Sequence, residues 1–339
     1  MSRSIAVGIV GATGLVGETF IQLLEKSEYN FTELRLFASE KSKGRSINFR
    51  DQSFACQVLE NGCFKGLDVV FFSSGDDISK EWAPKAVEDG AIAIDNSAAY
   101  RMNPTTPLVV PEINFHHIAS ATTPQIIANP NCSTIQLVMA LEALKEFGIE
   151  EVRVASYQSV SGAGKEGIED LVNQSQQVLR GENLQPGKTF ILPIAFDCQP
   201  KIGSFNDEGF CSEEIKIMQE TKKILDLPGL KISAFTVRVP TMNAHGEACW
   251  VTLNRDVDRA TIEKALQACD FISYLPHNSE KSFHSYREVQ GETNAFVSRL
   301  RKDPGFENTW MMWVVADNLQ RGAAANGLLI AQRIFDKLS

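Results

Sequence analysis

One cysteine of this chain stands where an asparagine-rich turn ends and an apolar run begins. Cys132 follows Asn131 and precedes “TIQLVMALEALKEF” (134–147). The positive end of a helix dipole favours the thiolate form of a thiol at a helix start, and thiolates attack carbonyl carbons. With a nicotinamide cofactor nearby, the resulting thiohemiacetal would lose hydride and become a thioester. The alternative is a buried cysteine that only begins a helix, so the other polar residues must decide.

Three further side chains have types and positions suited to acyl chemistry. The segment “RVPTMNAHGEAC” (238–249) carries Arg238 and His245 on either side of a proline turn. An arginine can clamp a carboxylate with two parallel hydrogen bonds, and a histidine exchanges protons near neutral pH. Considered alone, His245 also fits a surface loop histidine. Gln158 lies on a strand that leads to a glycine-containing loop, where its amide could orient a substrate or stabilise an oxyanion.

Charged residues elsewhere are ordinary when each is taken by itself. Glu213 and Lys216 lie three residues apart on one face of the helical segment 211–225, which is typical of a solvated ion pair. Arg101 follows a strand in “DNSAAYRM” (95–102), and nothing in its immediate neighbourhood assigns it a role.

A glycine-rich turn near the start indicates dinucleotide binding. “VGIVGATGLVG” places Gly11, Gly14 and Gly17 between an apolar strand and a helical pattern. Small residues there let the backbone approach a pyrophosphate, whose charge the helix N-terminus favours. The strand–turn–helix setting supports this interpretation over a tight turn needed only for packing.

The end of the second predicted strand favours NADP over NAD. An NAD site usually has an acid there for the ribose 2′-hydroxyl. Here “ASEKSKGR” (38–45) surrounds Glu40 with Ser39, Lys41 and Ser42. Hydroxyls and a cation suit a 2′-phosphate, and Glu40 is then expected to point to solvent.

Hydrophobic periodicity predicts two different architectures along the chain. Before Cys132, continuous apolar strands alternate with helices, which predicts a Rossmann-type, doubly wound parallel sheet. After Cys132, alternating strands predict a mixed or antiparallel sheet with helices on one face, and a final helix is expected to pack back on the first domain. The predicted strands are 4–11, 33–39, 68–74, 91–97, 151–160, 231–239, 247–253, 294–302 and 309–317; the predicted helices are 15–27, 82–90, 133–147, 167–181 and 322–338; segment 196–210 is predicted to be a loop.

Composition limits the class of protein. The 339 residues are 43% hydrophobic and 22% charged, which fits two soluble globular domains. A net charge of -9 argues against nucleic-acid or membrane partners. No apolar run could span a bilayer, and the first residues lack signal-peptide features. The 7 scattered cysteines have no metal-ligand spacing, so reduced thiols, no metal and a cytoplasmic location are expected.

Taken together, the motifs resemble those of bacterial-type aspartate-semialdehyde dehydrogenases. “VGIVGATGLVG”, “DNSAAYRM”, “VVPEIN”, “ANPNCSTIQ”, “SYQSVSGAGKEG”, “EEIKIMQETKKIL”, “RVPTMNAHGEA” and “ADNLQRGAAANGLLIA” occur in the family's order, from near residue 5 to near residue 336. The resemblance implies a fold like that of glyceraldehyde-3-phosphate dehydrogenase. It also implies an NADP-binding domain (1–130, completed by helix 322–339), a catalytic and dimerisation domain (131–321), and a homodimer built from the second domains.

The family's reaction is the reversible, NADPH-dependent reductive dephosphorylation of L-aspartyl 4-phosphate to L-aspartate 4-semialdehyde and phosphate. It is a step in the diaminopimelate, lysine, threonine and methionine biosynthetic routes. The resemblance implies that Cys132 forms the acyl-thioester, that His245 is the general acid and base, and that Gln158 orients the substrate and intermediate.

The resemblance also implies a binding role for each charged residue. Arg238 would hold the substrate α-carboxylate and Glu213 the α-amino group, which matches the cation and the anion that an amino acid requires. The implied phosphate-binding set is Arg101, Asn131 and Lys216. Motif positions in contact with the cofactor are Thr13, Gly14, Leu15, Val16, Ser39, Ser161, Gly162 and Asn318, to which the residue arguments above add Gly11, Lys41 and Ser42.

Three alternatives remain at this level. An N-acetyl-glutamyl-phosphate reductase shares the chemistry but has no use for an acid that binds a free ammonium, such as Glu213. Phosphorylating glyceraldehyde-3-phosphate dehydrogenase has a different sequence around its cysteine. A non-catalytic NADP-binding regulator or scaffold would bind cofactor without phosphate-dependent reduction of NADP.

Overall fold

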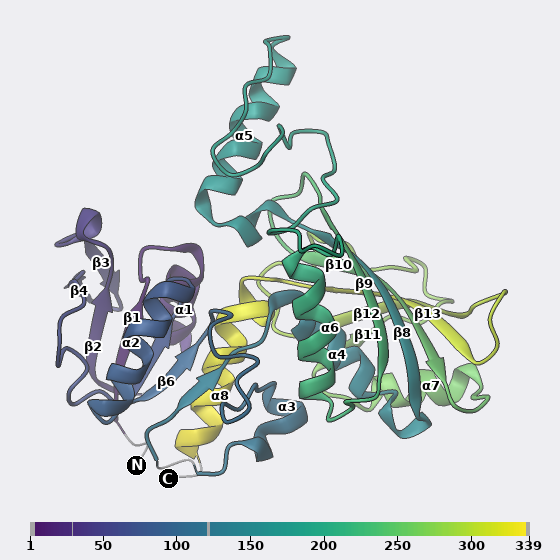
Figure 1. Cartoon of the computed structure of the whole chain (residues 1–339), viewed down its shortest axis with the longest axis horizontal. Helices are drawn as coiled ribbons and strands as arrows, with labels where there is room; N and C mark the ends of the chain where they lie inside the picture. The colour runs from purple at the N-terminus through teal and green to yellow at the C-terminus, as the bar shows by residue number, and fades with distance from the viewer. Residues whose placement is uncertain (1–3, 29, 121–122, 337–339) are drawn as a thin grey trace. The chain divides into compact units, whose positions relative to one another are not determined.

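The computed structural model describes residues 4–28, 30–120 and 123–336. Contacts within the chain divide it into two compact units (Figure 1). The first unit comprises residues 1–131 and 323–339, and the second comprises residues 132–322. Each unit has a sheet of its own.

The sheet of the first unit is parallel throughout. Its order is β2-β1-β5-β6-β7, formed by β1 (Ile5–Val10), β2 (Phe31–Phe37), β5 (Val69–Phe72), β6 (Ile92–Asp95) and β7 (Ile126–Ala128). Strands β1, β5 and β6 are buried along their whole length, as expected of strands covered on both faces. The predicted doubly wound parallel sheet is therefore confirmed. The sequence analysis missed β7 and the hairpin of β3 (Ser46–Phe49) and β4 (Gln52–Ala55).

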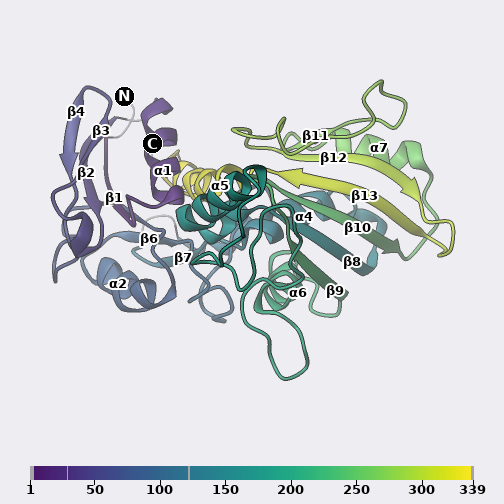
Figure 2. The same ribbon diagram turned by 90° about the horizontal axis from the view of Figure 1, so that it is seen from above.

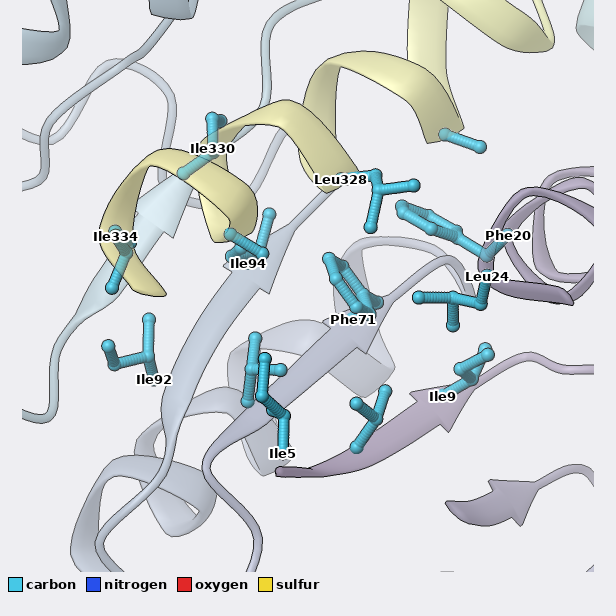
Figure 3. Packing of buried hydrophobic residues seen from close by; sticks show 14 of the residues in the cluster. Ile5, Ile9, Phe20, Leu24, Phe71, Ile92, Ile94, Leu328, Ile330 and Ile334 are labelled. Atoms are coloured by element: carbon cyan, nitrogen blue, oxygen red, sulfur yellow. The ribbon is translucent and has the colours of Figure 1, made fainter. Parts of the chain in front are cut away.

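Helices α1 (Leu15–Lys26) and α8 (Ala325–Asp336) cover one face of this sheet. Figure 3 shows side chains of both helices directed toward those of β1, β5 and β6. The rings of Phe20 on α1 and Phe71 on β5 are stacked with their centroids 4.5 Å apart. The chain's last helix is thus part of the core of the first unit.

Some helix ends differ from the sequence prediction for local reasons. Helix α2 (Asp76–Glu88) begins six residues before the predicted start at 82, directly after Gly75, which has a φ of +92°. At the other end of the chain, residues 320–324 form a short π-helix before the regular α8, so the predicted helix 322–338 is not uniform. Residues 337 and 338 of that prediction lie outside the described residues.

The sheet of the second unit is mixed, as predicted, in the order β11-β12-β13-β10-β8-β9 (Figure 2). The pairs β8–β9 and β11–β12 are parallel, and the other three pairs are antiparallel. The strands are β8 (Ile149–Gln158), β9 (Lys231–Arg238), β10 (His245–Leu253), β11 (Ile272–Tyr274), β12 (Ala295–Lys302) and β13 (Thr309–Ala316).

Helices α4 (Cys132–Glu142) and α6 (Ser212–Ile224) lie side by side against this sheet. Helix α4 contacts β10, β12 and β13, and almost all of its residues are buried. Helix α5 (Lys165–Leu179) stands away from the sheet (Figure 1). The sequence analysis did not predict α7 (Arg259–Gln267) or β11.

All seven cysteines are free thiols. No helix among the described residues is long and apolar enough to cross a membrane.

Candidate active site

Three adjacent strands of the second unit place three of the predicted residues in one row. Gln158 ends β8; it pairs with Arg238 at the end of parallel β9 and with His245 at the start of antiparallel β10. Paired residues on neighbouring strands project from the same face of a sheet. Their exposed fractions are 1% for Gln158, 6% for Arg238 and 0% for His245. Residues that are far apart in the sequence thus form one buried polar row.

Helix α6 adds two charges to this row. The side-chain amide of Gln158 donates to Oε1 of Glu213 at 3.1 Å, and the ammonium of Lys216 lies 3.3 Å from Oε2. Glu213 is buried, whereas Lys216 is partly exposed. The pair is therefore not simply a solvated ion pair, because its carboxylate faces the row in the sheet.

The N-terminal end of α6 is fixed to the strand that carries Arg238. Cys211 is the N-cap residue, and its backbone N–H donates to Oε2 of Glu214 at 2.9 Å. Oε1 of the same carboxylate accepts from the backbone N–H of Thr236 on β9 at 3.0 Å. A capping interaction thus also ties the first helical turn, which contains Glu213, to β9.

His245 is buried as a neutral ring. Burial, and then the positive charge of Arg238, lower the pKa of His245 to about 3. Nδ1 accepts from the backbone N–H of Ser159 at 3.1 Å and also lies 3.0 Å from the carbonyl oxygen of Ala244. Each neutral tautomer therefore has a partner at Nδ1. Among the described residues Nε2 has no hydrogen-bond partner, so it can gain or lose a proton on behalf of a reacting group.

A glycine lets the backbone approach this row. A Cβ added to Gly162 would lie 2.9 Å from Nη1 of Arg238 and 3.3 Å from Nε2 of His245. The same guanidinium nitrogen donates to the carbonyl oxygen of Ser159 at 2.6 Å. The structure thus places Gly162, a predicted cofactor residue, against two of the predicted substrate and catalytic groups.

Two other predicted cofactor residues support the histidine. Oδ1 of Asn318 accepts from the backbone N–H of Ala244 at 2.9 Å, and Nδ2 of Asn318 donates to the hydroxyl of Ser161 at 3.0 Å. Ser159, whose hydroxyl lies 3.2 Å from Nδ1 of His245, joins the same network. The sequence analysis missed Ser159. The only feature that could have indicated it is a hydroxyl side chain directly after Gln158.

Cys132 is the first residue of α4, as predicted, and is half-buried. A Cβ on Gly322 would come within 2.8 Å of the Cys132 Cβ, so a glycine is needed beside the thiol. Burial lowers the pKa of Arg238, whereas the negative charges of Glu213 and of a Cys132 thiolate raise it. The guanidinium thus interacts with two anionic positions of the site.

The first unit contains the remaining predicted substrate ligands. Nε of Arg101 donates to the carbonyl oxygen of Asn129 at 2.9 Å, and Nη2 donates to that of Asn96 at 2.8 Å. Asn131 is buried and ends the first of the two segments that form the unit. Two of the three predicted phosphate ligands therefore belong to the first unit, and Lys216 belongs to the second.

The glycine turn has the geometry of a dinucleotide cradle. Gly11 has a φ of +84°, and a Cβ there would lie 2.8 Å from the carbonyl oxygen of Ser73. Gly14 caps α1, whose first residues are Leu15 and Val16, so backbone N–H groups of the first helical turn remain available for an anion. Thr13 lies within the turn itself.

The predicted 2′-phosphate residues follow β2 at the same edge of the sheet. The backbone N–H groups of Gly11 and Ala12 both donate to the carbonyl oxygen of Phe37, which ends β2. Ser39 caps a short 3-10 helix that contains Lys41 and Ser42, and no residue of that helix is buried. Glu40 is exposed, and its carboxylate lies 4.0 Å from the Lys43 ammonium, consistent with a side chain directed to solvent.

The one acid of β10 is buried and forms no salt bridge with a described residue. Glu247 lies two residues beyond His245 and is fully buried. Burial raises the pKa of Glu247 well above its ordinary value, and the nearby amide of Gln136 on α4 lowers it in part. Neither carboxyl oxygen makes a hydrogen bond of ordinary geometry with a described residue. The sequence analysis did not single out Glu247.

Comparison with known proteins gives the same identification over both units. Residues 6–121 match the family model described as semialdehyde dehydrogenase, NAD binding domain. Residues 141–321 match the model described as semialdehyde dehydrogenase, dimerisation domain.

Individual relatives match along almost the whole chain. The aspartate-semialdehyde dehydrogenase of Aquifex aeolicus is 40% identical over 328 residues, 96% of each chain, and that of Bacillus subtilis is 38% identical over 98% of each. The crystal structure of Vibrio cholerae aspartate semialdehyde dehydrogenase II complexed with ASA has a TM-score of 0.94 at 37% identity, with 99% of each chain covered. The Candida albicans enzyme with NADP has a TM-score of 0.76 at 23% identity over 98% of this chain and 99% of that one, which shows a shared fold.

The buried neutral His245 predicts a pH effect on stability. Between pH 6.5 and 3 the unfolded chain binds a proton at this residue and the folded chain does not, so stability falls as the pH falls. Denaturant unfolding should show that the wild type loses about 2 kcal/mol more than His245→Gln between pH 7 and 4.5. Parallel curves for the two proteins would contradict a buried neutral ring.

For Glu247 we predict an effect of pH on stability that is opposite in sign to that of His245. The raised folded pKa of Glu247 means that the unfolded chain releases a proton above about pH 4.5 while the folded chain keeps it, so this residue destabilises the protein as the pH rises. Relative to the wild type, Glu247→Gln should become progressively more stable from pH 4.5 to 8 in the same measurement. A stability difference that does not change with pH would show that Glu247 is ionised in the folded chain.

Proposed function

Because the chain belongs to the aspartate-semialdehyde dehydrogenase family, we propose that it reduces L-aspartyl 4-phosphate to L-aspartate 4-semialdehyde and phosphate with NADPH. The observation that carries this proposal is the buried row of Arg238, Gln158 and His245, with Glu213 hydrogen-bonded to Gln158. The row contains a cation, an anion and an acid–base group in one unit that also contains Cys132.

The two buried charges suit the amino-acid end of the substrate. A zwitterion has one carboxylate and one ammonium, and the opposite charges are offered by Arg238, paired with Gln158 in the sheet, and by Glu213, hydrogen-bonded to the Gln158 amide. Charges buried in this way interact strongly with a ligand because little water screens them. A substrate with an acylated nitrogen would leave the Glu213 carboxylate without a cation, which disfavours an N-acetyl-glutamyl-phosphate reductase.

The acyl end reacts at Cys132. The thiolate attacks the carbonyl carbon of the acyl phosphate, the carbon–oxygen bond to phosphate breaks, and a thioester forms. NADPH, when bound, supplies the hydride that reduces this thioester. The thiohemiacetal then collapses to aldehyde and thiolate. During these steps Nε2 of His245 exchanges protons with the oxygen of the reacting carbonyl group and with the sulfur of Cys132. Gln158 orients the carbonyl group for these steps.

The phosphate needs cations of its own. Arg101, Asn131 and Lys216 are proposed to bind it, the first with a guanidinium whose orientation is set by two backbone carbonyls. Lys216 already lies beside Glu213, so the ammonium would be shared between the carboxylate and a phosphate.

The residues of the first unit fit a pyridine nucleotide. The turn at Gly11 has a positive φ and packs closely against the backbone of Ser73, and the α1 N-terminus offers N–H groups to a pyrophosphate. Ser39, Lys41 and Ser42 favour NADP over NAD. Residues 1–130 with 322–339 are accordingly proposed as the NADP-binding domain, and residues 131–321 as the catalytic and dimerisation domain of a homodimer. The enzyme would act in the cytoplasm in diaminopimelate, lysine, threonine and methionine biosynthesis.

Replacing the proposed nucleophile tests the mechanism. Purified enzyme given aspartate semialdehyde, phosphate and NADP should produce the NADPH absorbance, with a higher kcat/KM than with NAD. Cys132→Ala should lower kcat by at least ~10³-fold, because covalent catalysis is lost. The exposed Cys198→Ala serves as the control and should keep full activity. Activity that survives in Cys132→Ala would exclude the thioester, and no activity in the wild type would favour a non-catalytic NADP-binding protein.

A substitution of Glu213 tests whether the substrate has a free ammonium group. Glu213→Gln keeps the shape but removes the charge that meets the substrate ammonium, so kcat/KM for aspartate semialdehyde should fall by about 10- to 100-fold. The KM for NADP should stay unchanged. Glu208→Gln, an exposed acid that precedes the same helix, is the matched control. An unchanged kcat/KM in Glu213→Gln would remove this residue from the substrate site.

A further inference from the structure

A pocket of about 460 Å³ opens in the second unit, remote in sequence from every proposed site residue. The start of α7, the bulged part of β12 and a loop between β11 and β12 supply its walls. Of the described residues that line it, none is acidic. The lining residues are Arg259, His277, Ser282, Phe283, Arg299, Leu300 and Arg301.

The three arginines of this pocket are not neutralised. Among the described residues, Arg259, Arg299 and Arg301 form no salt bridge, unlike Arg35 and Arg153, which each lie within 3 Å of a carboxylate. A chain with a net charge of -9 has many acids available for pairing. A group of unpaired guanidiniums in such a chain indicates an anion-binding site.

Nearby acids form no salt bridge with the three arginines among the described residues. Glu263 accepts a hydrogen bond from the Tyr274 hydroxyl and lies 3.3 Å from the ring of His277. Glu288 pairs with Lys281. Asp303, which follows β12, partly offsets the charge of Arg301 without forming a salt bridge to it.

The arginines repel one another in the free protein. Burial lowers the pKa of Arg301, and the positive charge of Arg299 lowers it further. Nη1 of Arg301 donates to the carbonyl oxygen of Arg299 at 2.9 Å, which keeps the two residues together. A bound anion would relieve this repulsion.

The backbone of the pocket is strained at two positions. Arg299 has a φ of +59° and Ser282 a φ of +66°, and neither is a glycine. The pairing of β12 with β13 shifts register between Ser298 and Arg301, so a bulge carries the arginine. Such conformations cost ~1 kcal/mol or more each and persist where side chains must be presented in a fixed direction.

The pocket also has an apolar wall. The ring of Phe283 is 49% exposed, and Leu300 is buried beneath the pocket. A single carboxylate would satisfy one guanidinium, whereas three guanidiniums match two or more phosphate groups. An exposed aromatic ring beside them suits the planar base of a nucleotide.

We propose that this pocket binds a nucleoside di- or triphosphate, with the phosphates on Arg259, Arg299 and Arg301 and the base against Phe283. The site belongs entirely to the second unit and is separate from the Arg238–Gln158–His245 row and from the residues proposed to bind NADP. The proposal does not depend on the dehydrogenase reaction.

Calorimetric titration with ADP and with inorganic pyrophosphate tests the proposal, in buffer with saturating NADPH so that the cofactor site is filled. Both ligands should bind the wild type at one site per chain. Arg299→Gly removes a phosphate contact at a backbone position where glycine is unstrained, so the fold is kept and binding of both ligands should weaken at least 10-fold. Phe283→Ala should weaken ADP alone.

Arg50→Gly is the matched control, because Arg50 also has a positive φ, of +52°, and lies in the other unit. It should bind both ligands as the wild type does. Absence of binding to the wild type, or equal binding by Arg299→Gly and the wild type, would overturn the proposal. Equal loss of ADP and pyrophosphate binding in Phe283→Ala would refute the assignment of the base to the ring.

Discussion

The register of β8 with its two neighbours is the constraint on which the candidate active site depends. Gln158 can pair with both Arg238 and His245 only in this register, and a slip of one residue would turn a strand's side chains to the other face. Burial holds the register: beyond His245 and Glu247, the same face of β10 carries Cys249, Val251 and Leu253, all buried. The hydrophobic effect acting on the far end of the strand therefore positions the polar end, where a histidine and an acid would otherwise favour exposure to water.

The same burial determines the charge states within the row. A fully buried imidazole beside a guanidinium stays neutral, whereas Arg238 interacts with the negative charge of Glu213, whose carboxylate accepts a hydrogen bond from the Gln158 amide. Burial raises the pKa of Glu247, two residues further along β10, well above its ordinary value. Burial and nearby charges therefore set the protonation state of each group, and the opposite charges of Arg238 and Glu213 match those of a zwitterionic ligand.

Long strands and helices could be predicted from the sequence because their hydrophobic pattern repeats several times. Strands β1, β8, β9 and β10 appear within two residues of their predicted bounds, whereas β7 and β11 have three residues each, too few for a pattern. For the site, residue chemistry and family motifs indicated Cys132, Gln158, Arg238 and His245, and the structure brings the last three into one row. Ser159 and Glu247 could not be found in this way, because one acts through a backbone contact formed by strand pairing and the other is distinguished only by burial among 42 acidic residues.

The two proposed sites of the second unit differ in how far negative groups compensate the charges of their arginines. Arg238 is already compensated in the free protein by Glu213 and by the carbonyl oxygen of Ser159, so a ligand must offer charges of both signs to improve on that arrangement. Arg299 and Arg301 form no salt bridge with a described residue, and the positive charge of Arg299 lowers the pKa of Arg301, which Asp303 only partly offsets. A compensated cation selects a zwitterion, and an uncompensated group of cations selects a net anion. The same residue type, in one unit of one chain, is therefore suited to an amino acid at the ends of β8, β9 and β10 and to phosphates at the bulge of β12.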